Sequence, residues 1–315
     1  MESIAASTRR TYEAGVRSYL RFTESHGIVD PYPASDMHLT LWFTYLAEKD
    51  SPVSARSIKT YLSGVVSFHE RLGYAELMRD KPLSLRAWMG IRRHQGERER
   101  RTRLPITTGV LRDKIRPHLR HGSNLGRVVW AVCCLATCGL FRCGELVSTS
   151  STELGLMGHQ LTMFDDQDQP VPLTDRDAWN GVTRISITLL QSKTDPWRKG
   201  VNVHVGHTMA IEAWIAYLHG LPTLLSPLSP LFQSAPGVAL TRSTFLSEVR
   251  TALTSAGVRA SDYAGHSFRR GGATSLRVAG VPDSLIQLLG RWKSDSYRTY
   301  IEPSVRAVVE AGRRM

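Results

Sequence analysis

The sequence has no long apolar segment. No apolar run reaches the roughly 18 residues that a membrane-spanning helix needs. The longest candidate, residues 128–140, is shorter and contains several cysteines and a threonine. The first ten residues are polar and lack the apolar core of a secretory signal. We therefore expect an intracellular protein that does not enter a membrane.

Cysteine is also scarce, and all four cysteines lie in one apolar segment, at Cys133, Cys134, Cys138 and Cys143. A structural zinc site needs a closely spaced pair of ligands and a second, distant pair. This spacing supplies neither, so we expect reduced, buried thiols that pack as small core residues. We predict no metal and no cofactor.

Acidic residues are in the minority. The chain has 28 Asp and Glu against 40 Lys and Arg, which gives a formal net charge of +12. A basic excess indicates a polyanionic partner, most often nucleic acid, although a merely soluble basic surface is the alternative. Arginine dominates residues 86–103, and its forked guanidinium suits phosphate oxygens. The DNA-binding arginines predicted there are Arg86, Arg92, Arg93, Arg98, Arg100, Arg101 and Arg103.

The first hundred residues read as helices, because apolar positions recur three and four residues apart. One helix follows a possible cap at Ser7, a second covers residues 39–46, a third runs from Ser54 to near Gly73, and a fourth spans about 84–93. No strand signal interrupts them. We predict a compact four-helix module.

A charged segment follows this module. Residues 96–104 are almost wholly charged and have no apolar face, and Pro105 comes next. Such a segment is typical of a linker. Since 315 residues are long for one domain, we predict domains at 1–95 and 107–315, joined by a basic linker at 96–106.

The second part mixes helices with a few strands. Helices are expected at 108–119, 128–138 and 143–148, and strand signals appear only after Leu154. Residues 184–191 partly alternate and residues 201–205 alternate strictly, which predicts an antiparallel hairpin. From Met209 onward the pattern is helical, broken by a proline-rich loop at 221–230. The fold class is therefore mainly α: an all-helical first domain and an α+β second domain with a small antiparallel sheet.

Two clusters of side chains that could take part in a chemical reaction lie in the first half of the second domain. Arg142 directly precedes a predicted helix, with Glu145 three residues on. A helix N-terminus and an arginine make an anion site, and the carboxylate can hold the guanidinium in place. The alternative is a structural ion pair. Lys193, in the predicted hairpin turn, is either a solvated lysine or a catalytic one.

Two further clusters follow towards the C-terminus. His266 and Arg269 are three residues apart and share a face if they lie on a helix. Imidazole moves protons near neutral pH, so the pair suits phosphate chemistry, while a helix-capping histidine beside an exposed arginine is the alternative. Tyr297 and Tyr300 follow the phrase Gly-Arg-Trp292, and taken alone they read as core or surface aromatics.

Taken together and in this order, the arginine, lysine, histidine, arginine and tyrosine resemble the tyrosine recombinase (phage integrase) family. The match covers about 107–301. Its most specific part is the phrase His266-Ser-Phe-Arg269-Arg-Gly-Gly-Ala, followed by Leu-Gly-Arg-Trp292 and a tyrosine eight residues later. The helical module resembles the family's core-binding domain less specifically. The motif looks closest to that of the eukaryotic mobile-element branch (DIRS/Ngaro or Crypton).

The resemblance implies a site-specific recombinase or integrase that needs neither metal nor ATP. It implies that Tyr300 attacks the scissile phosphorus to form a 3′-phosphotyrosyl intermediate. It also implies that Arg142 and Arg269 clamp the phosphate and that Lys193 protonates the leaving 5′-oxygen. His266 would then assist proton transfer, and Glu145 would orient Arg142 or His266.

One position departs from the family pattern. A His or Trp often lies nine residues before the tyrosine, but here that residue is Arg291, and Trp292 lies eight before. Trp292 takes the hydrogen-bonding role, or Arg291 adds a third cation; we favour Trp292. Arg270 and Arg291 join the predicted DNA-binding set. Tyr297 is the rival nucleophile, but the spacing favours Tyr300.

The implied partners are double-stranded DNA and further copies of the chain. Recombination requires four protomers on two DNA sites, and a monomer in free solution is compatible with that. Val305, Val308 and Val309 predict a small terminal helix that docks on a neighbouring subunit. We expect the nucleus as the compartment in a eukaryote and the cytoplasm otherwise. The alternatives are a domesticated, non-catalytic DNA-binding protein and a type IB topoisomerase.

Overall fold

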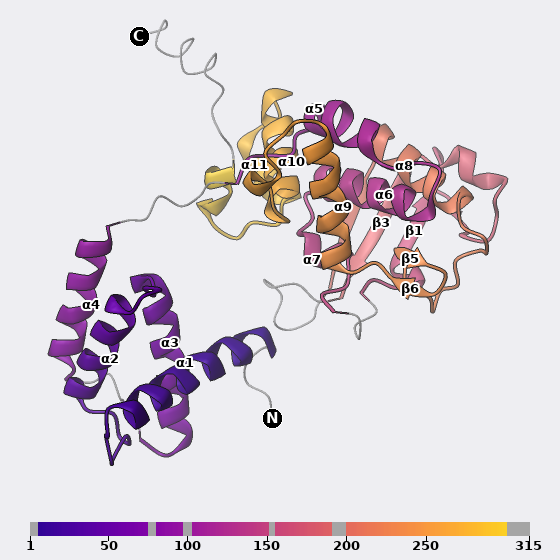
Figure 1. The fold of residues 1–315 in the computed structure, drawn as a ribbon. Helices are drawn as coiled ribbons and strands as arrows, with labels where there is room; N and C mark the ends of the chain where they lie inside the picture. The colour runs from indigo at the N-terminus through magenta and orange to yellow at the C-terminus, as the bar shows by residue number, and fades with distance from the viewer. Residues whose placement is uncertain (1–5, 75–79, 97–102, 151–154, 191–199, 301–315) are drawn as a thin grey trace, which may run out of the picture. The chain divides into compact units, whose positions relative to one another are not determined.

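The computed structural model describes residues 6–74, 80–96, 103–150, 155–190 and 200–300. The chain divides into two compact units, Met1–Arg100 and Arg101–Met315. Figure 1 shows a purely helical first unit and a second unit that combines helices with a small sheet. This is the predicted fold class. No helix in the described ranges is both long and apolar enough to cross a bilayer.

The first unit consists of four helices. Ser35 and Ser54 precede the second and third helices, and each hydroxyl accepts a hydrogen bond from the backbone N–H three residues on. Ser7 lies inside the first helix, so its predicted role as a cap is wrong. The helices are α1 (Ala6–Ser25), α2 (Asp36–Glu48), α3 (Ala55–Arg71) and α4 (Pro82–Gln95).

The backbones of α1 and α3 make close contact at two glycines. A Cβ atom added to Gly15 would lie 2.4 Å from the carbonyl oxygen of Tyr61, and one added to Gly64 would lie 2.4 Å from that of Tyr12. Only residues without a side chain allow this approach. The core beside the crossing includes the fully buried Tyr19, Phe22, Leu39, Trp42 and Phe43.

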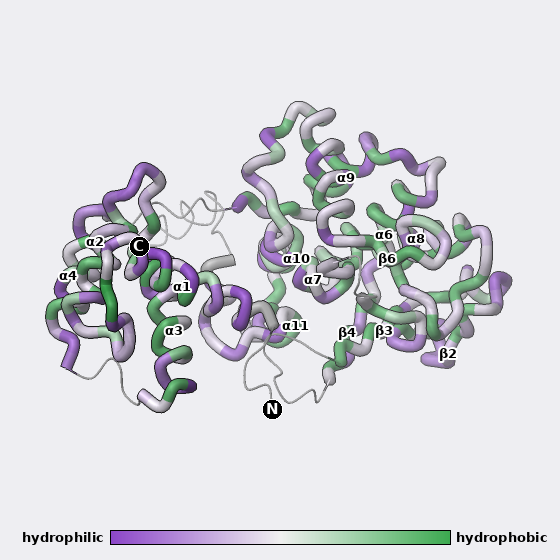
Figure 2. The backbone as a smooth tube through the Cα atoms, turned by 60° about the horizontal axis from the view of Figure 1, so that its bottom comes forward, coloured by the Kyte–Doolittle hydropathy of each residue, from purple (hydrophilic) through white to green (hydrophobic). Residues whose placement is uncertain are grey.

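The second unit is built around α6 (Asn124–Cys138), which is almost wholly buried and strongly hydrophobic (Figure 2). It packs against α8 (Thr208–His219), α9 (Arg242–Ser255) and α10 (His266–Val278). The helix predicted at 108–119 winds as three successive types. These are α5 (Thr108–Val110), the π-helical η1 (Leu111–Ile115) and the 3₁₀-helical η2 (Arg116–His118).

The sheet has the strand order β2-β1-β3-β4 and is antiparallel throughout. The predicted hairpin is confirmed, because β3 (Arg184–Leu189) pairs with β4 (Val201–Val205) with Ile187 opposite Val203. The remaining strands of this sheet are β1 (Leu161–Phe164) and β2 (Pro170–Val171).

A second, two-stranded sheet lies where a continuous helical region was predicted after the proline-rich loop, so that prediction is wrong. Its strands are β5 (Gln233–Ala235) and β6 (Val238–Ala239). Gly237 makes the turn with φ +72°. Strands of two and three residues are too short to show an alternating pattern.

The four cysteines are free thiols, of which Cys133, Cys134 and Cys143 are buried and Cys138 is half-buried. Burial raises the pKa of the Cys138 thiol to about 12 and that of the Cys143 thiol to about 11. At neutral pH they are protonated and behave as small apolar groups. The prediction of unpaired core thiols is confirmed for Cys133, Cys134 and Cys143, whereas Cys138 lies at the edge of the core.

Candidate active site

The site begins at the short helix α7 (Cys143–Leu146), which follows the buried α6 directly. Arg142 is the residue before its first turn. The backbone N–H of Arg142 donates to Oε2 of Glu145 at 2.9 Å, and its Nη1 donates to Oε1 at 2.6 Å. The side chain of Glu145 is only 7% exposed, whereas that of Arg142 is 23% exposed. The carboxylate therefore fixes the guanidinium while leaving part of it accessible.

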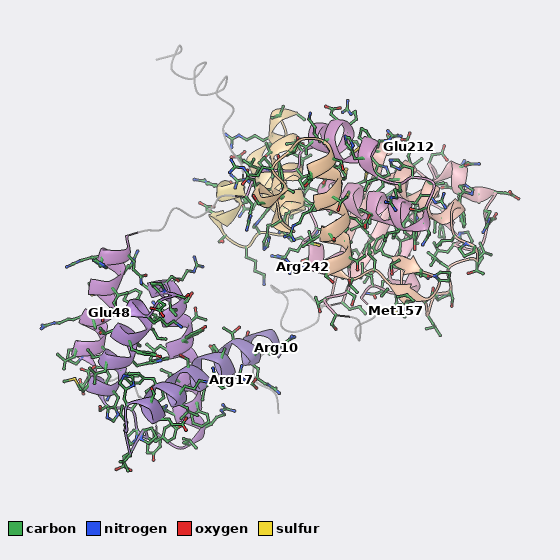
Figure 3. The ribbon with its side chains drawn as sticks, viewed as in Figure 1. Arg10, Arg17, Glu48, Met157, Glu212 and Arg242 are labelled. Atoms are coloured by element: carbon green, nitrogen blue, oxygen red, sulfur yellow. The ribbon has the colours of Figure 1, made fainter. Side chains whose placement is uncertain are left out.

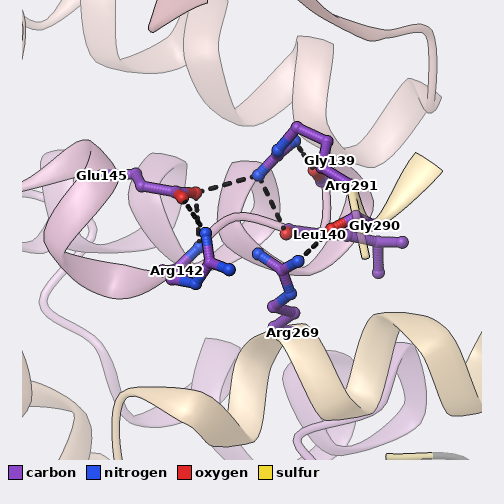
Figure 4. A network of polar contacts seen from close by, with 7 residues as sticks. All are labelled: Gly139, Leu140, Arg142, Glu145, Arg269, Gly290 and Arg291. Carbon is purple, nitrogen blue, oxygen red and sulfur yellow. Dashed lines mark hydrogen bonds and ion pairs between the residues drawn. The ribbon is translucent and has the colours of Figure 1, made fainter. Parts of the chain in front are cut away.

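A second arginine reaches the same carboxylate from the other end of the domain. Nη2 of Arg291 donates to Oε2 of Glu145 at 2.9 Å. Its nitrogens also donate to the carbonyl oxygens of Gly139 at 3.4 Å and Leu140 at 3.3 Å. The guanidinium lies 5.1 Å from the centre of the Phe141 ring. Figure 4 shows dashed lines that join the Glu145 carboxylate to both arginines.

Burial lowers the pKa of the Arg291 guanidinium, and the charge of Glu145 acts in the opposite direction. Arginine has such a high intrinsic pKa that it stays protonated near neutral pH. Glu145 therefore carries two permanently cationic neighbours.

The third arginine of the site is Arg269, in the first turns of α10. It is 1% exposed, donates to the carbonyl oxygen of Gly290 (Figure 4), and lies 4.4 Å over the centre of the Trp292 ring. His266 is the first residue of α10 and is exposed. The two therefore lie one turn apart on one helix, as predicted.

The segment that leads to Tyr300 is anchored by Tyr297. Both belong to η6 (Asp295–Tyr300). Tyr297 is 4% exposed and packs in an apolar cluster with Leu140, Ala273 and Ile286. Its ring centre lies 6.2 Å from that of Trp292. Tyr300 is the last residue of η6, and its side chain lies outside the described part of the chain.

The predicted DNA-binding arginines fall into two groups. Arg86, Arg92 and Arg93 are exposed on α4. Arg270 is 8% exposed and donates to the carbonyl oxygen of Arg103 at 3.0 Å, and the guanidinium of Arg103 donates to that of Ser261. Arg270, Arg103 and Arg291 thus contact main-chain carbonyls within the second unit.

Several predicted residues lie outside the described residues, so no contact is assigned to them. These are Lys193, the arginines Arg98, Arg100 and Arg101, and the terminal valines Val305, Val308 and Val309.

Arg242 is a cation that the sequence reasoning missed. It begins α9 and is labelled in Figure 3. Burial raises the pKa of the Cys143 thiol, and the charge and hydrogen bond of the Arg242 guanidinium partly offset that rise. A Cβ atom added to Gly265 would lie 3.3 Å from its Nη2. Arg242 therefore adds positive charge between the N-termini of α7 and α10, and no local motif marks it.

Metal ligands do not gather in the part of the chain that the structure describes. No group of three or more His, Cys, Asp or Glu side chains is placed there to hold an ion.

Comparison with known proteins matches residues 1–75 to the phage integrase N-terminal SAM-like domain. The Tn1549 transposon integrase, solved in complex with circular intermediate DNA, superposes with a TM-score of 0.61 at 12% identity. That match covers 98% of this chain and 94% of the solved integrase chain, which comprises residues 82–397 of that protein. The chain has the tyrosine recombinase fold.

A second tyrosine recombinase structure agrees. The XerH site-specific recombinase, solved after cleavage of a palindromic difH substrate, superposes with a TM-score of 0.59 at 14% identity. It covers 96% of this chain and 78% of XerH. No curated protein sequence matches the chain. The predicted resemblance to tyrosine recombinases is confirmed at the level of fold, while the eukaryotic mobile-element branch stays a prediction.

Proposed function

We propose that the chain is a site-specific DNA recombinase or integrase that cuts and rejoins DNA through a phosphotyrosyl intermediate. The observation that carries the proposal is the convergence of Arg142, Arg269 and Arg291 within a tyrosine recombinase fold. These arginines come from three distant segments, and such a concentration of fixed positive charge suits a phosphodiester.

Cationic clamping is the main demand of this reaction. The pentacoordinate transition state gathers negative charge on the non-bridging oxygens, so preorganised donors stabilise it more than the ground state. Arg142 is the accessible donor, because its side chain is 23% exposed. Arg269 is covered by Trp292 and the Gly290 carbonyl, so a phosphate reaches it only when this turn moves aside.

Tyr300 is the proposed nucleophile. Its oxygen attacks phosphorus, the bond to the 5′-oxygen breaks, and a 3′-phosphotyrosyl ester and a free 5′-hydroxyl result. The ester conserves the energy of the broken bond, so reversal with a new 5′-hydroxyl rejoins DNA without ATP. The burial of Tyr297 in an apolar cluster supports Tyr300, because a buried phenol cannot approach DNA.

The remaining roles follow from chemistry and chain position. Lys193 donates the proton that the departing 5′-oxygen needs. His266, exposed at the start of α10, assists proton transfer at the tyrosine. Glu145 orients Arg142 through two hydrogen bonds. Trp292 supports Arg269 with its ring face, a contact that favours a cation.

In this proposal the helical module at 1–95 binds DNA and the domain at 107–315 performs catalysis. The basic segment 96–106 links the two. Four protomers on two DNA sites perform the exchange, with the C-terminal segment docking on a neighbouring subunit. The exposed arginines of α4 contact phosphates, which position the protein but do not select sequence.

Product analysis tests the function and separates it from its alternatives. Purified protein is incubated in EDTA with two DNA fragments of different length. Each fragment carries the DNA sequence that borders the gene for this protein (the flanking DNA). A recombinase produces joined fragments of new lengths. A type IB topoisomerase relaxes supercoiled plasmid without joining fragments, and a domesticated binding protein shifts the DNA in a gel but changes neither product.

A further inference from the structure

We infer that Arg291 is a positioning residue that neutralises Glu145, so that the positive charge of Arg142 remains available to the scissile phosphate. The inference rests on the proposed function. It assigns Arg291 a role inside the protein, in place of a contact with DNA.

The hydrogen bonds of Glu145 divide between the two arginines. Oε1 accepts from the side chain of Arg142, and Oε2 accepts from the side chain of Arg291 and the backbone of Arg142. Both distances to guanidinium nitrogens are short, at 2.6 and 2.9 Å. Glu145 therefore holds Arg142 with one oxygen and Arg291 with the other.

The net charge of Arg142, Glu145 and Arg291 together determines how strongly they attract a phosphate. A buried carboxylate paired with one arginine makes a neutral pair that offers little to an incoming anion. Adding Arg291 leaves the three groups with a net charge of +1. Because Glu145 is 7% exposed and Arg291 is 13% exposed, their attraction is weakly screened by water. The most exposed cation, Arg142, is then free to attract the phosphate.

The contacts of Arg291 are those of an internal tether. Besides Glu145, its nitrogens donate to two carbonyl oxygens of the loop that precedes Arg142, and its plane lies near the Phe141 ring. It thereby fixes both the carboxylate and the backbone that carries Arg142. Little of the guanidinium is left to face a ligand.

The backbone conformation of Arg291 explains how two adjacent side chains reach different partners. Arg291 has φ +58°, a left-handed conformation that is uncommon for a residue with a side chain. The turn directs Arg291 towards Glu145 and Trp292 towards Arg269. A residue in a strained conformation at a functional site is often there for its role.

The test compares Arg291→Gln, Arg291→Lys and Glu145→Gln/Arg291→Gln with wild type. Glutamine keeps a side chain at the positive φ, so the backbone cost is unchanged while the charge is lost. The control is Arg277→Gln. Arg277 lies on the same helix as Arg269, and the substitution breaks its exposed ion pair with Asp283. The substrate is the flanking DNA nicked beside the cleavage site, and the rate of covalent complex formation is measured in a single turnover.

We expect Arg291→Gln to slow covalent complex formation about 10- to 100-fold, the cost that losing the hydrogen-bonding partner of a metal ligand has at metal sites, with little change in DNA affinity. Arg291→Lys recovers part of the rate. The double variant is faster than Arg291→Gln, because the carboxylate that needed neutralising has gone. Arg277→Gln matches wild type.

A methylphosphonate at the scissile position supplies a readout that a folding defect cannot imitate. This substrate lacks one negative charge, so the Arg291→Gln defect shrinks to about threefold or less if the defect is electrostatic, since less charge then needs stabilising. Rates on the two substrates come from one preparation, so their ratio is independent of the folded fraction.

Equal defects on both substrates, or a wild-type rate for Arg291→Gln, would overturn the inference while leaving the recombinase function intact. Failure of the wild type itself to form a covalent complex would instead reject the proposed function, and the inference with it.

Discussion

Arg142 is the residue whose loss should damage the reaction most directly among those with described side chains. We expect Arg142→Ala to slow covalent complex formation by about 10²–10³, the usual cost of losing one preorganised donor. DNA affinity should stay within a few-fold of wild type, because many other cations bind phosphates. The measurement pairs single-turnover rates with binding assays. A large loss of affinity at an unchanged rate would contradict the assignment.

His69 gives the first unit a defined response to acid. Its Nε2 accepts from the backbone N–H of Ala34 at 3.0 Å, so Nδ1 carries the proton donated to the Val65 carbonyl at 2.8 Å. Burial lowers the pKa of this imidazole. The folded state therefore binds fewer protons than the unfolded state, and stability falls as pH drops below about 6.5.

The expected result is a lower urea midpoint for the first unit at pH 5 than at pH 7.5. His69→Gln should lose less over this range, because an amide oxygen can accept from Ala34 without titrating. Equal acid sensitivity in both proteins would show that other groups cause it.

Local spacing predicted part of the site at this scale. A carboxylate three residues after an arginine at a helix start predicts the Arg142–Glu145 pair, which the structure contains. The bond from Arg291 to the same carboxylate spans 146 positions. No pattern within a single sequence marks such a pair, because it depends on how α7 and the turn after α11 (Asp283–Leu289) meet.

Close helix crossing is the feature of the elements that a small substitution tests best. We expect Gly64→Ala to destabilise the first unit by about 1–3 kcal/mol, the usual range for overpacking, because the new Cβ would lie 2.4 Å from a backbone carbonyl of α1. Gly90→Ala is the matched control, since nothing lies within 4 Å of its added Cβ. It should stabilise α4 by about 0.5–1 kcal/mol.

Urea unfolding of both variants checks the comparison. A Gly64→Ala protein as stable as wild type would mean that α1 and α3 are not in backbone contact.

The elements were predictable to different degrees for a physical reason. Long helices and the β3–β4 hairpin have a periodic pattern over enough residues to be recognised. The winding of 108–118 through three helix types and the strands β5 and β6 depend on tertiary packing over two to five residues. Sequence periodicity carries no information at that length.

Charge is the property of the whole molecule that should govern DNA affinity. With a net charge of +12, affinity should fall steeply with salt, by about 0.9 log units per log unit of salt for each phosphate contacted. Replacing Arg86, Arg92 and Arg93 by glutamine should reduce this slope by up to about 3. Titrations of random-sequence duplex at several salt concentrations measure it, with Arg277→Gln as control. An unchanged slope would remove α4 from the interface.

The overall fold was predictable because the catalytic residues keep their order along the sequence even where overall sequence identity to solved recombinases is low. Five residues in one sequence order indicated the recombinase fold, and solved recombinases superpose on the chain at only 12–14% identity. The arrangement of DNA and of further protomers was not predictable in the same way, because it depends on surfaces and partners outside one chain.

Covalent trapping tests the central claim most directly. Wild type, Tyr300→Phe and Tyr297→Phe are incubated in EDTA with the nicked flanking DNA, and the mixtures are denatured and separated by size. The account predicts a denaturation-resistant protein–DNA band with wild type that is lost with Tyr300→Phe. Tyr297→Phe should keep a band, since Tyr297 is buried in the core. A band that persists with Tyr300→Phe, or that never forms despite tight DNA binding, would contradict phosphotyrosine chemistry at Tyr300.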